Sequence, residues 1–355
     1  MPGERFVTAW RRSCVLPFMV ALTVGACGAG PTASPSVTAS PTSSASVACA
    51  TPPPPLPTIG QPADDGARIV KVETLDDRTR DLTIESPAVG TAMVRLLLPR
   101  TFASRPEARF PVLYLLHGGG GEYTDWTQNT TVEAYTAPTD LLVVMPAASS
   151  SGLDGWYTDW AEGGTCGPRL WETFHLTELR QLLERNWQAG DRRAIAGLSL
   201  GGYGSITYAA RHPGLFAAAA SYSGALDLRG YFERFPDPYE AARWGDPVTD
   251  ASNWDGHDPI ELAPQLRGTG VYLSFGTGQP GPLDPPGADE DQLEAFISGG
   301  NQRFLAALTS AGISATVDAY GPGTHSWPYW DRQLRTSLPF LLRALGESPA
   351  ATSSP

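Results

Sequence analysis

Short apolar runs alternate along this chain with segments whose apolar residues recur at helical spacing. The runs have the length of buried strands. They are Ala92–Leu98, Val112–Leu116, Leu141–Met145, Ala194–Ala196, Ala217–Ser221 and Val271–Phe275. The segment from Leu170 to Trp187 instead places its large apolar residues on one helical stripe, and Leu293–Ala311 and Trp330–Leu345 also have a helical pattern. This alternation predicts a mostly parallel central sheet with helices on both faces.

One region lacks both patterns. The segment from Leu228 to Pro264 is rich in Asp, Pro and Trp and shows no clear period. We expect it to be a cap-like insertion or a long loop within a single catalytic domain that spans residues 66–346.

The N-terminal residues are typical of a signal for export. Arg5, Arg11 and Arg12 precede an apolar stretch from Cys14 to Ala26 that is too short to span a bilayer comfortably. We therefore predict a signal peptide over residues 1–26. The small residues before Cys27 resemble a bacterial lipobox, in which this cysteine would be acylated and anchor the protein to the outer face of the cell membrane. An ordinary secretory signal is the alternative, and the protein is exported in either case.

Two further segments are predicted to be disordered. Residues 27–65 are rich in Ser, Thr and Pro, and no charge occurs between Arg12 and Asp64. Such a sequence has too little apolar surface to offset the entropy of ordering it, and its prolines favour an extended spacer. Residues 347–355 form a similarly featureless tail.

The composition argues against nucleic acid as a partner, and it does not show whether the cysteines form a disulfide. The 355 residues carry a net charge of −12, and Lys71 is the only lysine, so the basic surface of a nucleic-acid-binding protein is missing. Cys49 and Cys166 could form a disulfide after export or remain free thiols. No cysteine has a metal-site partner at a suitable spacing, so we expect no structural zinc. We also expect no other metal and no cofactor.

The strongest chemical motif is Gly197-Leu198-Ser199-Leu200-Gly201. It follows an apolar strand and opens into a helical stretch from Gly202 to Arg211, which is the context of a nucleophile elbow. The sharp turn leaves no space for side chains two positions from the serine and lifts its hydroxyl above the sheet. We predict Ser199 to be the nucleophile, against the alternative of a tight turn with a capping serine.

A glycine-rich loop, His117 to Gly121, follows the strand Val112–Leu116. Glycines there allow backbone N–H groups to approach a substrate carbonyl oxygen. Gly119 and Leu200 are therefore the candidate donors of an oxyanion hole. His117 is expected to shape this loop rather than act as a base, and we assign it, with Trp327, to substrate binding.

A serine nucleophile needs a base, and one of the five histidines lies in the expected place. His325 stands in a loop between a predicted strand and the last helix, and a histidine in that loop completes the order serine, acid, histidine. The acid is not determined by spacing, because no carboxylate directly follows the strand Val271–Phe275. The candidates are Asp284, Asp289, Glu290, Asp291 and Glu294.

Four separated motifs resemble one protein family. They are Tyr157–Trp160, Trp171–Phe174, the elbow, and Thr324–Trp330. Together they resemble the esterase D superfamily, and within it most closely the secreted mycolyltransferases of the antigen-85 type, over about residues 110–345. The resemblance implies an α/β-hydrolase fold and an acidic residue within a Leu-Glu-x-Phe pattern. Leu293-Glu294-Ala295-Phe296 matches this pattern, so the resemblance selects Glu294 as the acid.

The sequence also departs from the mycolyltransferases. His117 replaces the Asp that begins their glycine loop, and glycines occupy the position of the Arg that contacts trehalose. Pro328 stands where the family usually has Glu, and only Cys166 is present where the family has a local disulfide. Because of these changes we do not extend trehalose and mycolate specificity to this chain, although the three predicted catalytic residues are kept.

Three functions follow as hypotheses. The first is an exported serine esterase that hydrolyses carboxylic esters through an acyl-enzyme on Ser199, His325 and Glu294. The second is an acyltransferase with the same chemistry, in which a sugar or glycerol hydroxyl accepts the acyl group. The third is a non-catalytic cell-surface binding protein. The ester substrate, whether a small molecule, a lipid or an acylated sugar, is not predicted by the sequence.

Overall fold

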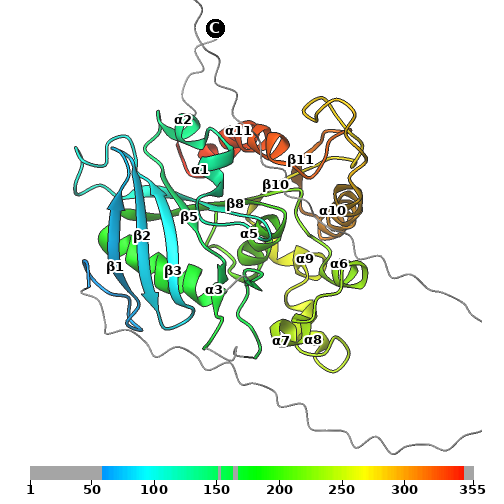
Figure 1. Ribbon diagram of the computed structural model, residues 1–355, viewed down its shortest axis with the longest axis horizontal. Helices are drawn as coiled ribbons and strands as arrows, with labels where there is room; N and C mark the ends of the chain where they lie inside the picture. The colour runs from blue at the N-terminus through cyan, green and yellow to red at the C-terminus, as the bar shows by residue number, and fades with distance from the viewer. Residues whose placement is uncertain (1–57, 151–152, 163–166, 348–355) are drawn as a thin grey trace, which may run out of the picture. The chain divides into compact units, whose positions relative to one another are not determined.

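The computed structural model describes residues 58–150, 153–162 and 167–347. Their nine-stranded sheet has the order β1-β2-β3-β5-β4-β8-β9-β10-β11 (Figure 1). The strands are β1 (Arg68–Thr74), β2 (Thr79–Ser86), β3 (Gly90–Leu97), β4 (Phe110–Leu116), β5 (Leu142–Pro146), β8 (Ala189–Leu198), β9 (Ala218–Tyr222), β10 (Gly270–Phe275) and β11 (Ala315–Ala319). From β5 through β4 to β11 all neighbours are parallel, whereas β1, β2, β3 and β5 pair antiparallel.

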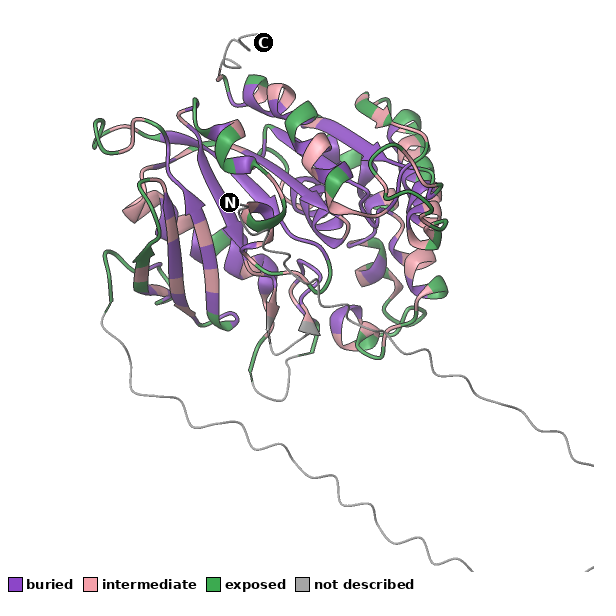
Figure 2. Ribbon diagram, turned by 45° about the horizontal axis from the view of Figure 1, so that its top comes forward, coloured by how far each residue is buried: buried purple, intermediate pink, exposed green. Residues whose placement is uncertain are grey.

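Helices cover both faces of the sheet, as the alternating pattern predicts. Tyr114, Ile195 and Leu273 are buried on the face covered by α3 (Trp171–Thr173), a π-helical turn (Phe174–Leu179), α4 (Arg180–Asn186), α5 (Leu200–Arg211) and α10 (Gln292–Ser310). Leu113 and Val143 are buried on the opposite face, covered by α1 (Asp125–Asn129), α2 (Val132–Thr136) and α11 (Trp327–Ala344). The central strands are therefore buried on both sides (Figure 2), which explains why they are continuously apolar in sequence.

All six strands that were predicted with bounds are present, and β11 is the strand expected, without bounds, before the loop of His325. The strands β1 and β2 were not predicted, nor was a separate two-stranded sheet of β6 (Ser149–Ser150) and β7 (Leu153–Asp154). Each of β1 and β2 alternates polar and apolar residues, and β11 is a short edge strand with mostly exposed residues. These strands bury one face at most, so none of them contains the continuous apolar run by which the central strands were recognised.

The segment of residues 228–266 is a helical cap and not a long loop. It contains α6 (Leu228–Arg234), α7 (Glu240–Trp244), α8 (Ala251–Asp255), α9 (Pro259–Leu262) and a 3-10 turn (Ala263–Leu266). Each helix has at most seven residues, which is too short for a recurring apolar stripe to appear in the sequence. Phe232, Trp244 and Trp254 anchor the cap to the core.

Residues 58–65, which the sequence analysis assigns to the linker, pack against the folded domain. Ile59 forms a β-bridge with Ile69, and Ala63 is buried. The backbone N–H groups of Gln61 and Asp64 donate to side chains of α4, at 2.7 and 2.8 Å. These hydrogen bonds, the β-bridge of Ile59 and the burial of Ala63 hold residues 58–65 against the domain, although their composition resembles that of the preceding linker.

The predicted signal peptide, Cys27 and Cys49 lie outside the described residues, as do Cys166 and all but the first residue of the predicted C-terminal tail. None of the helices within the described ranges has the length and apolar character needed to cross a membrane.

Candidate active site

Ser199 lies at a strained turn between β8 and α5. Its backbone has φ 51° and ψ −116°, a left-handed conformation that a non-glycine residue adopts at a cost. A Cβ on Gly197 would lie 2.2 Å from the oxygen of Gly201, and a Cβ on Gly201 would lie 2.4 Å from the oxygen of Leu116. The two glycines of the motif are therefore required by close packing of the backbone, and the turn has the geometry of a nucleophile elbow.

The glycine loop after β4 lies beside this elbow. Gly119 and Leu200 both line a pocket that contains Ser199, and within the described residues neither backbone N–H donates a hydrogen bond. The adjacent Gly120 N–H donates to the carboxylate of Asp154, at 3.0 and 3.2 Å. Asp154 thus holds the loop in place beside two amides that have no acceptor in the described part of the chain.

The imidazole of His117 is held by the backbone. The ring is buried, its Nε2 accepts from the N–H of Ala148 at 3.0 Å, and its Nδ1 lies 2.8 Å from the oxygen of Gly118. Burial lowers the pKa of this histidine despite the hydrogen bond to Gly118. Both nitrogens are therefore occupied, so we now assign His117 to the shape of the loop and no longer to contact with substrate.

His325 and Glu294 form a hydrogen-bonded pair. The Nδ1 of His325 lies 2.7 Å from Oε2 of Glu294, which is completely buried. The other carboxylate oxygen accepts from the Ser223 hydroxyl at 2.9 Å and from the N–H of Gly276 at 2.7 Å. These donors follow β9 and β10, so the ends of two adjacent strands hold Glu294 beside the histidine. The Nε2 of His325 is buried and has no partner in the described part of the chain.

Asp291 connects the two members of this pair, which the sequence analysis did not foresee. Its Oδ1 accepts from the N–H groups of Leu293 and Glu294, at 2.9 and 3.0 Å, and thereby caps helix α10. Its Oδ2 accepts from the N–H of His325 at 2.9 Å. One carboxylate therefore fixes the backbone of both Glu294 and His325.

Asp284 and Asp289, two other candidates for the acid, have different surroundings from Glu294. Asp284 accepts from the N–H of Gly281 at 2.7 Å and from the Tyr329 hydroxyl at 2.8 Å, and also bonds Thr324. Asp289 is exposed. Of the carboxyl side chains in the described residues, Glu294 alone bonds the His325 ring.

Two pockets meet at Ser199. The first, which we call the histidine pocket, has a volume of about 590 Å³ and is lined by His325, Leu293, Ser326, Trp327 and Trp330 besides Ser199. The second, which we call the cap pocket, has a volume of about 450 Å³ and contains Trp156 together with residues 231–243 of the cap. Gly119 and Tyr231 line both pockets. Trp327 lines the histidine pocket, so a substrate bound there could contact it.

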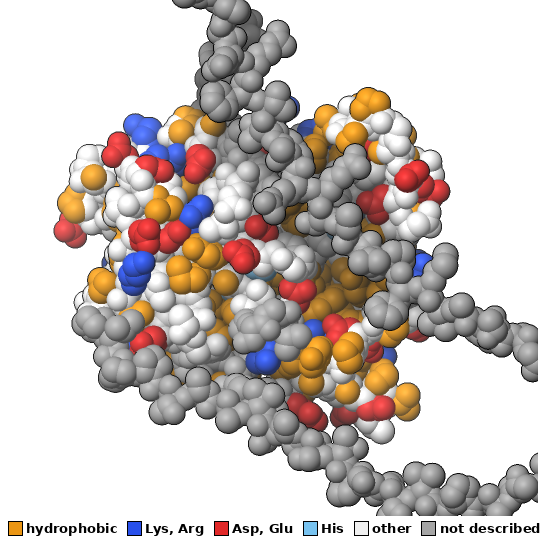
Figure 3. Space-filling model, in the orientation of Figure 1, with side chains coloured by type: hydrophobic (Ala, Val, Ile, Leu, Met, Phe, Trp, Pro, Cys, Tyr) orange, Lys and Arg blue, Asp and Glu red, His pale blue; other side chains and the backbone are white. Residues whose placement is uncertain are grey.

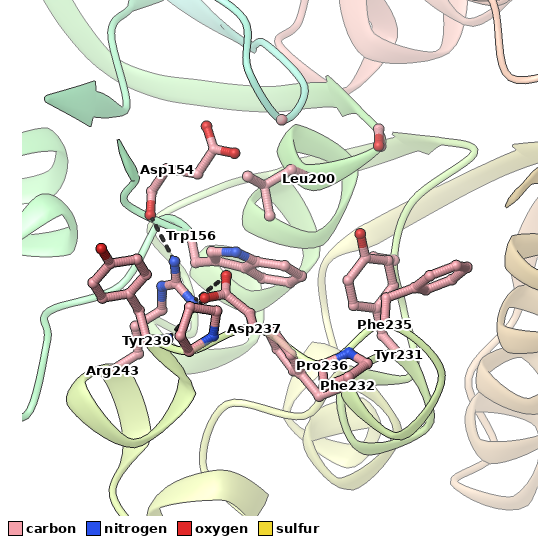
Figure 4. Close-up of a pocket in the computed structure, with 14 residues that line it drawn as sticks. Asp154, Trp156, Leu200, Tyr231, Phe232, Phe235, Pro236, Asp237, Tyr239 and Arg243 are labelled. Carbon is pink, nitrogen blue, oxygen red and sulfur yellow. Dashed lines mark hydrogen bonds and ion pairs between the residues drawn. The ribbon is translucent and has the colours of Figure 1, made fainter. Parts of the chain in front are cut away.

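The cap pocket has an aromatic part and a charged part (Figure 4). Trp156, Tyr231, Phe232 and Phe235 surround the former, and the ion pair of Asp237 with Arg243 lies in the latter. In the space-filling view, hydrophobic side chains gather over the segment that carries α6 to α8 and in the recess beside it (Figure 3). The sequence analysis identified none of these cap residues, because no local motif marks them.

Comparisons with known sequences identify the family of this chain. Residues 86–341 match the family described as "Putative esterase". A Mycobacterium tuberculosis protein named esterase Rv1288 is 32% identical over 270 residues, which are 72% of this chain but only 57% of that relative. A Mycobacterium leprae protein named diacylglycerol acyltransferase/mycolyltransferase Ag85B is 32% identical over 255 residues, 67% of this chain and 77% of that protein.

A solved structure agrees as well. The Mycobacterium tuberculosis protein MPT51 (FbpC1) has a TM-score of 0.62 and 26% sequence identity, over 76% of this chain and 100% of that one. The predicted resemblance to esterases and antigen-85 proteins and the predicted α/β-hydrolase fold are confirmed. This chain therefore belongs to the esterase family of α/β-hydrolase-fold proteins.

Proposed function

We propose that this protein is a serine esterase that hydrolyses carboxylic esters through an acyl-enzyme intermediate. The observation that carries the proposal is the buried Glu294–His325 pair, whose histidine shares a pocket with Ser199. The similarity to proteins named as esterases and acyltransferases supports the same reaction class.

Each polar group then has a defined part in the reaction. The hydroxyl of Ser199 attacks the ester carbonyl carbon while Nε2 of His325 takes its proton. Glu294 accepts the Nδ1–H of His325, which keeps Nε2 unprotonated before attack and stabilises the imidazolium afterwards. The N–H groups of Gly119 and Leu200 stabilise the oxyanion of the tetrahedral intermediate. His325 next protonates the leaving alcohol, and water then repeats the sequence to release the acid.

The direct test is labelling of the protein by a fluorophosphonate probe, together with hydrolysis of simple esters. We expect labelling of Ser199, and we expect Ser199→Ala to abolish labelling and to lower turnover by at least about a thousandfold. Ser205→Ala is the control, because this serine lies on the same helix but donates to backbone oxygens. Unchanged turnover in Ser199→Ala would refute the mechanism, and absence of labelling in the wild type would favour a non-catalytic binding protein.

Acyl transfer is the second candidate, and the similarity to diacylglycerol acyltransferase/mycolyltransferase Ag85B favours it. The chemistry is the same until the acyl-enzyme forms, after which a sugar or glycerol hydroxyl replaces water. Product analysis with and without an added polyol separates the two. An acylated polyol as the main product would identify a transferase, and free acid as the main product would identify an esterase.

We also propose that the enzyme is exported and anchored by a lipid on Cys27. The charged and apolar segments of residues 1–26 and the small residues before Cys27 support this location. Cys27→Ser should release the protein from the membrane fraction or leave its precursor unprocessed. Wild-type protein found only in the culture medium, with an unacylated N-terminus, would indicate simple secretion.

A further inference from the structure

We infer that the cap pocket binds the acyl part of the substrate, and that this acyl group carries an ammonium group close to the ester carbonyl, as in an aminoacyl ester. The partner of the ammonium group is the carboxylate of Asp154. The inference rests on the proposed esterase chemistry at Ser199, and it names a class of ester that neither the motifs nor the relatives assign.

The position of His325 determines which pocket takes which half of the ester. His325 must protonate the leaving oxygen, so the alcohol part has to lie on the side of the histidine. His325 lines the histidine pocket and is not among the residues that line the cap pocket. The acyl part therefore extends from Ser199 into the cap pocket.

The carboxylate of Asp154 lies beside the proposed oxyanion hole. Its two oxygens accept from the N–H of Gly120 at 3.0 and 3.2 Å, and a Cβ on Gly119 would lie 3.4 Å from Oδ2. An oxyanion bound by the N–H of Gly119 at ordinary hydrogen-bond length is therefore no more than about 9 Å from this carboxylate. The acyl chain starts at the same carbonyl carbon, so its first carbons lie close to a negative charge.

The negative charge of Asp154 is not neutralised by the pocket. Asp154, Asp237 and Arg243 are the charged residues that line it. Arg243 has only 2% of its side chain exposed and donates to Asp237 at 2.9 Å, whereas it contacts Asp154 through the backbone oxygen, at 3.3 Å. In Figure 4 the carboxylate of Asp154 points away from Arg243. Within the described ranges no ion pair includes Asp154, so its carboxylate is left for a ligand in the pocket.

This charge affects the reaction of neutral and charged esters differently. The tetrahedral intermediate carries a negative charge, and a carboxylate close to it in a partly buried site raises the energy of that intermediate. An ammonium group on the acyl chain removes this cost, because it pairs with the carboxylate beside the oxyanion. The rings of Trp156 and Tyr231, whose centres are 5.2 Å apart, add aromatic faces that attract a cation.

The length of the acyl chain follows from these distances. With the ammonium group on the first or second carbon after the carbonyl, its nitrogen lies within about 5 Å of the carbonyl oxygen. A charged hydrogen bond to Asp154 then adds about 2.8 Å, which fits the limit of about 9 Å. The ammonium group takes no part in the bond changes. The alcohol leaves with a proton from His325, and water releases the amino acid from Ser199.

The experiment compares methyl esters of equal shape with the full-length wild-type enzyme. The first pair is L-alanine and 2-methylpropanoic acid, the second is 3-aminopropanoic and butanoic acid, and monomethyl succinate provides an anion. At about pH 7 most of the amino groups are protonated. Each kcat/KM is divided by the rate constant for hydrolysis by hydroxide, which corrects for the reactivity of the ester itself.

We expect the ammonium ester to exceed its neutral partner by about tenfold or more in at least one pair, since charge-assisted hydrogen bonds are the stronger ones. The succinate should be the poorest substrate. Raising the salt concentration from about 0.02 to 0.5 M should reduce the preference, because salt screens charges. Equal values within both pairs, a preference for succinate, or a preference that salt does not change would overturn the inference.

The variant Asp154→Asn identifies the partner of the ammonium group. It removes the charge but keeps an oxygen that accepts from Gly120. We expect kcat/KM for the preferred ammonium ester to fall by about tenfold and that for succinate to rise. These opposite signs distinguish a lost charge from a damaged loop, which would lower both values. An equal loss for both esters would refute the role of Asp154.

Glu122→Gln is the matched control. Glu122 is exposed just after the glycine loop and lines neither pocket, so its loss removes one negative charge nearby without changing the acyl site. The order of the esters should stay that of the wild type. If the control changes the order as much as Asp154→Asn does, the selection comes from the overall charge and the role of Asp154 is refuted. If Asp154→Asn lowers the melting temperature, the esters and the salt series with the wild type decide.

Fluorophosphonate labelling separates this inference from the proposed function. An enzyme that is labelled at Ser199 and hydrolyses esters without the expected order contradicts only the choice of acyl group. An enzyme that is labelled but turns over none of these esters also contradicts it. A wild-type protein that is neither labelled nor active contradicts the esterase function itself.

Discussion

The histidine pocket and the cap pocket share Ser199 but come from different parts of the chain. His325 and Glu294 are held by loops that follow β9, β10 and β11, and the elbow and the glycine loop follow β8 and β4. All these loops lie at the carboxyl edge of the parallel strands, where the fold positions reactive groups. The walls of the cap pocket come mostly from α6, α7 and the segment between them.

The difference separates reaction chemistry from selectivity. The register of the parallel strands fixes the geometry of the groups at the sheet edge. The arrangement of these groups therefore does not depend on the sequence of the cap. The cap is an insertion of short helices that lines one of the two pockets at Ser199, and we expect its side chains to influence which substrate fits. Changes on the histidine side should therefore alter kcat, whereas changes in the cap should alter stability or the choice of ester.

The largest effect in this comparison is expected from Glu294→Gln. The neutral side chain no longer stabilises the imidazolium and can favour the wrong tautomer of His325, so kcat should fall by about 10⁴-fold while the fold is retained. Steady-state kinetics on a simple ester measures this loss. Asp284→Asn is the control, because Asp284 bonds Thr324 and Tyr329 and should leave kcat within about threefold. The opposite result, with Asp284→Asn inactive and Glu294→Gln active, would move the acid into the loop.

A smaller loss of activity is expected from Asp291→Ala. Three backbone N–H groups lose their acceptor, among them those of Glu294 and His325, so the pair is held less accurately. We expect kcat to fall by about 10- to 100-fold with little change in KM, in line with the cost of small misplacements in an active site. Asp291→Asn, which keeps one oxygen acceptor, should recover part of the activity. If KM rises and kcat stays the same, Asp291 acts on binding and not on the position of the pair.

The smallest effect on catalysis is expected from a change where the cap is anchored. Glu172 is buried and accepts from Arg211 at 3.0 Å and from His212 at 2.6 Å, and Arg211 also donates to Gly256 of the cap at 2.6 Å. Burial raises the pKa of Glu172, but the hydrogen bonds and charges of His212 and Arg211 outweigh it and lower the pKa overall. Glu172→Gln should reduce the free energy of unfolding by about 2 kcal/mol at neutral pH and leave kcat within about twofold.

The pH dependence of this effect has a defined sign. Because the pKa of Glu172 is lower in the folded protein than in the unfolded chain, ionised Glu172 stabilises the fold above the unfolded-state pKa of about 4.3. The advantage of the wild type over Glu172→Gln should shrink as the pH falls through the folded-state pKa. Urea denaturation at neutral pH and at about pH 3 measures both differences. A difference that stays constant with pH would show that the charge of Glu172 contributes nothing. The control is Glu73→Gln, which removes an exposed ion pair with Lys71 and should leave the free energy of unfolding nearly unchanged.

The sequence alone determined the parts of this protein that depend on a few neighbouring residues. The elbow at Ser199 could be predicted because its turn requires glycine at positions 197 and 201, and the central strands because burial on both faces leaves a continuous apolar run. The order of the motifs predicts His325 as the base, which stays a prediction, and the structure places it in the pocket of Ser199. The exposed edge strand β11 and the short helices of the cap carry no such local pattern.

Only the tertiary structure decided which distant side chains meet. Glu294 and His325 are 31 residues apart, and they come together because β10 and β11 are adjacent in the sheet and α10 begins beside the ends of β9 and β10. Spacing along the chain did not choose among the candidate carboxylates, and the sequence reached Glu294 only through a family resemblance. The fold directs the alternative Asp284 towards Thr324 and Tyr329. In the same way, Trp156 contacts Phe232 and Arg243 because the inserted cap packs against the core of the domain. Turns and apolar runs depend on a few neighbouring residues and can be recognised in the sequence. Contacts between distant side chains depend on strand order and on packing between segments far apart in the chain.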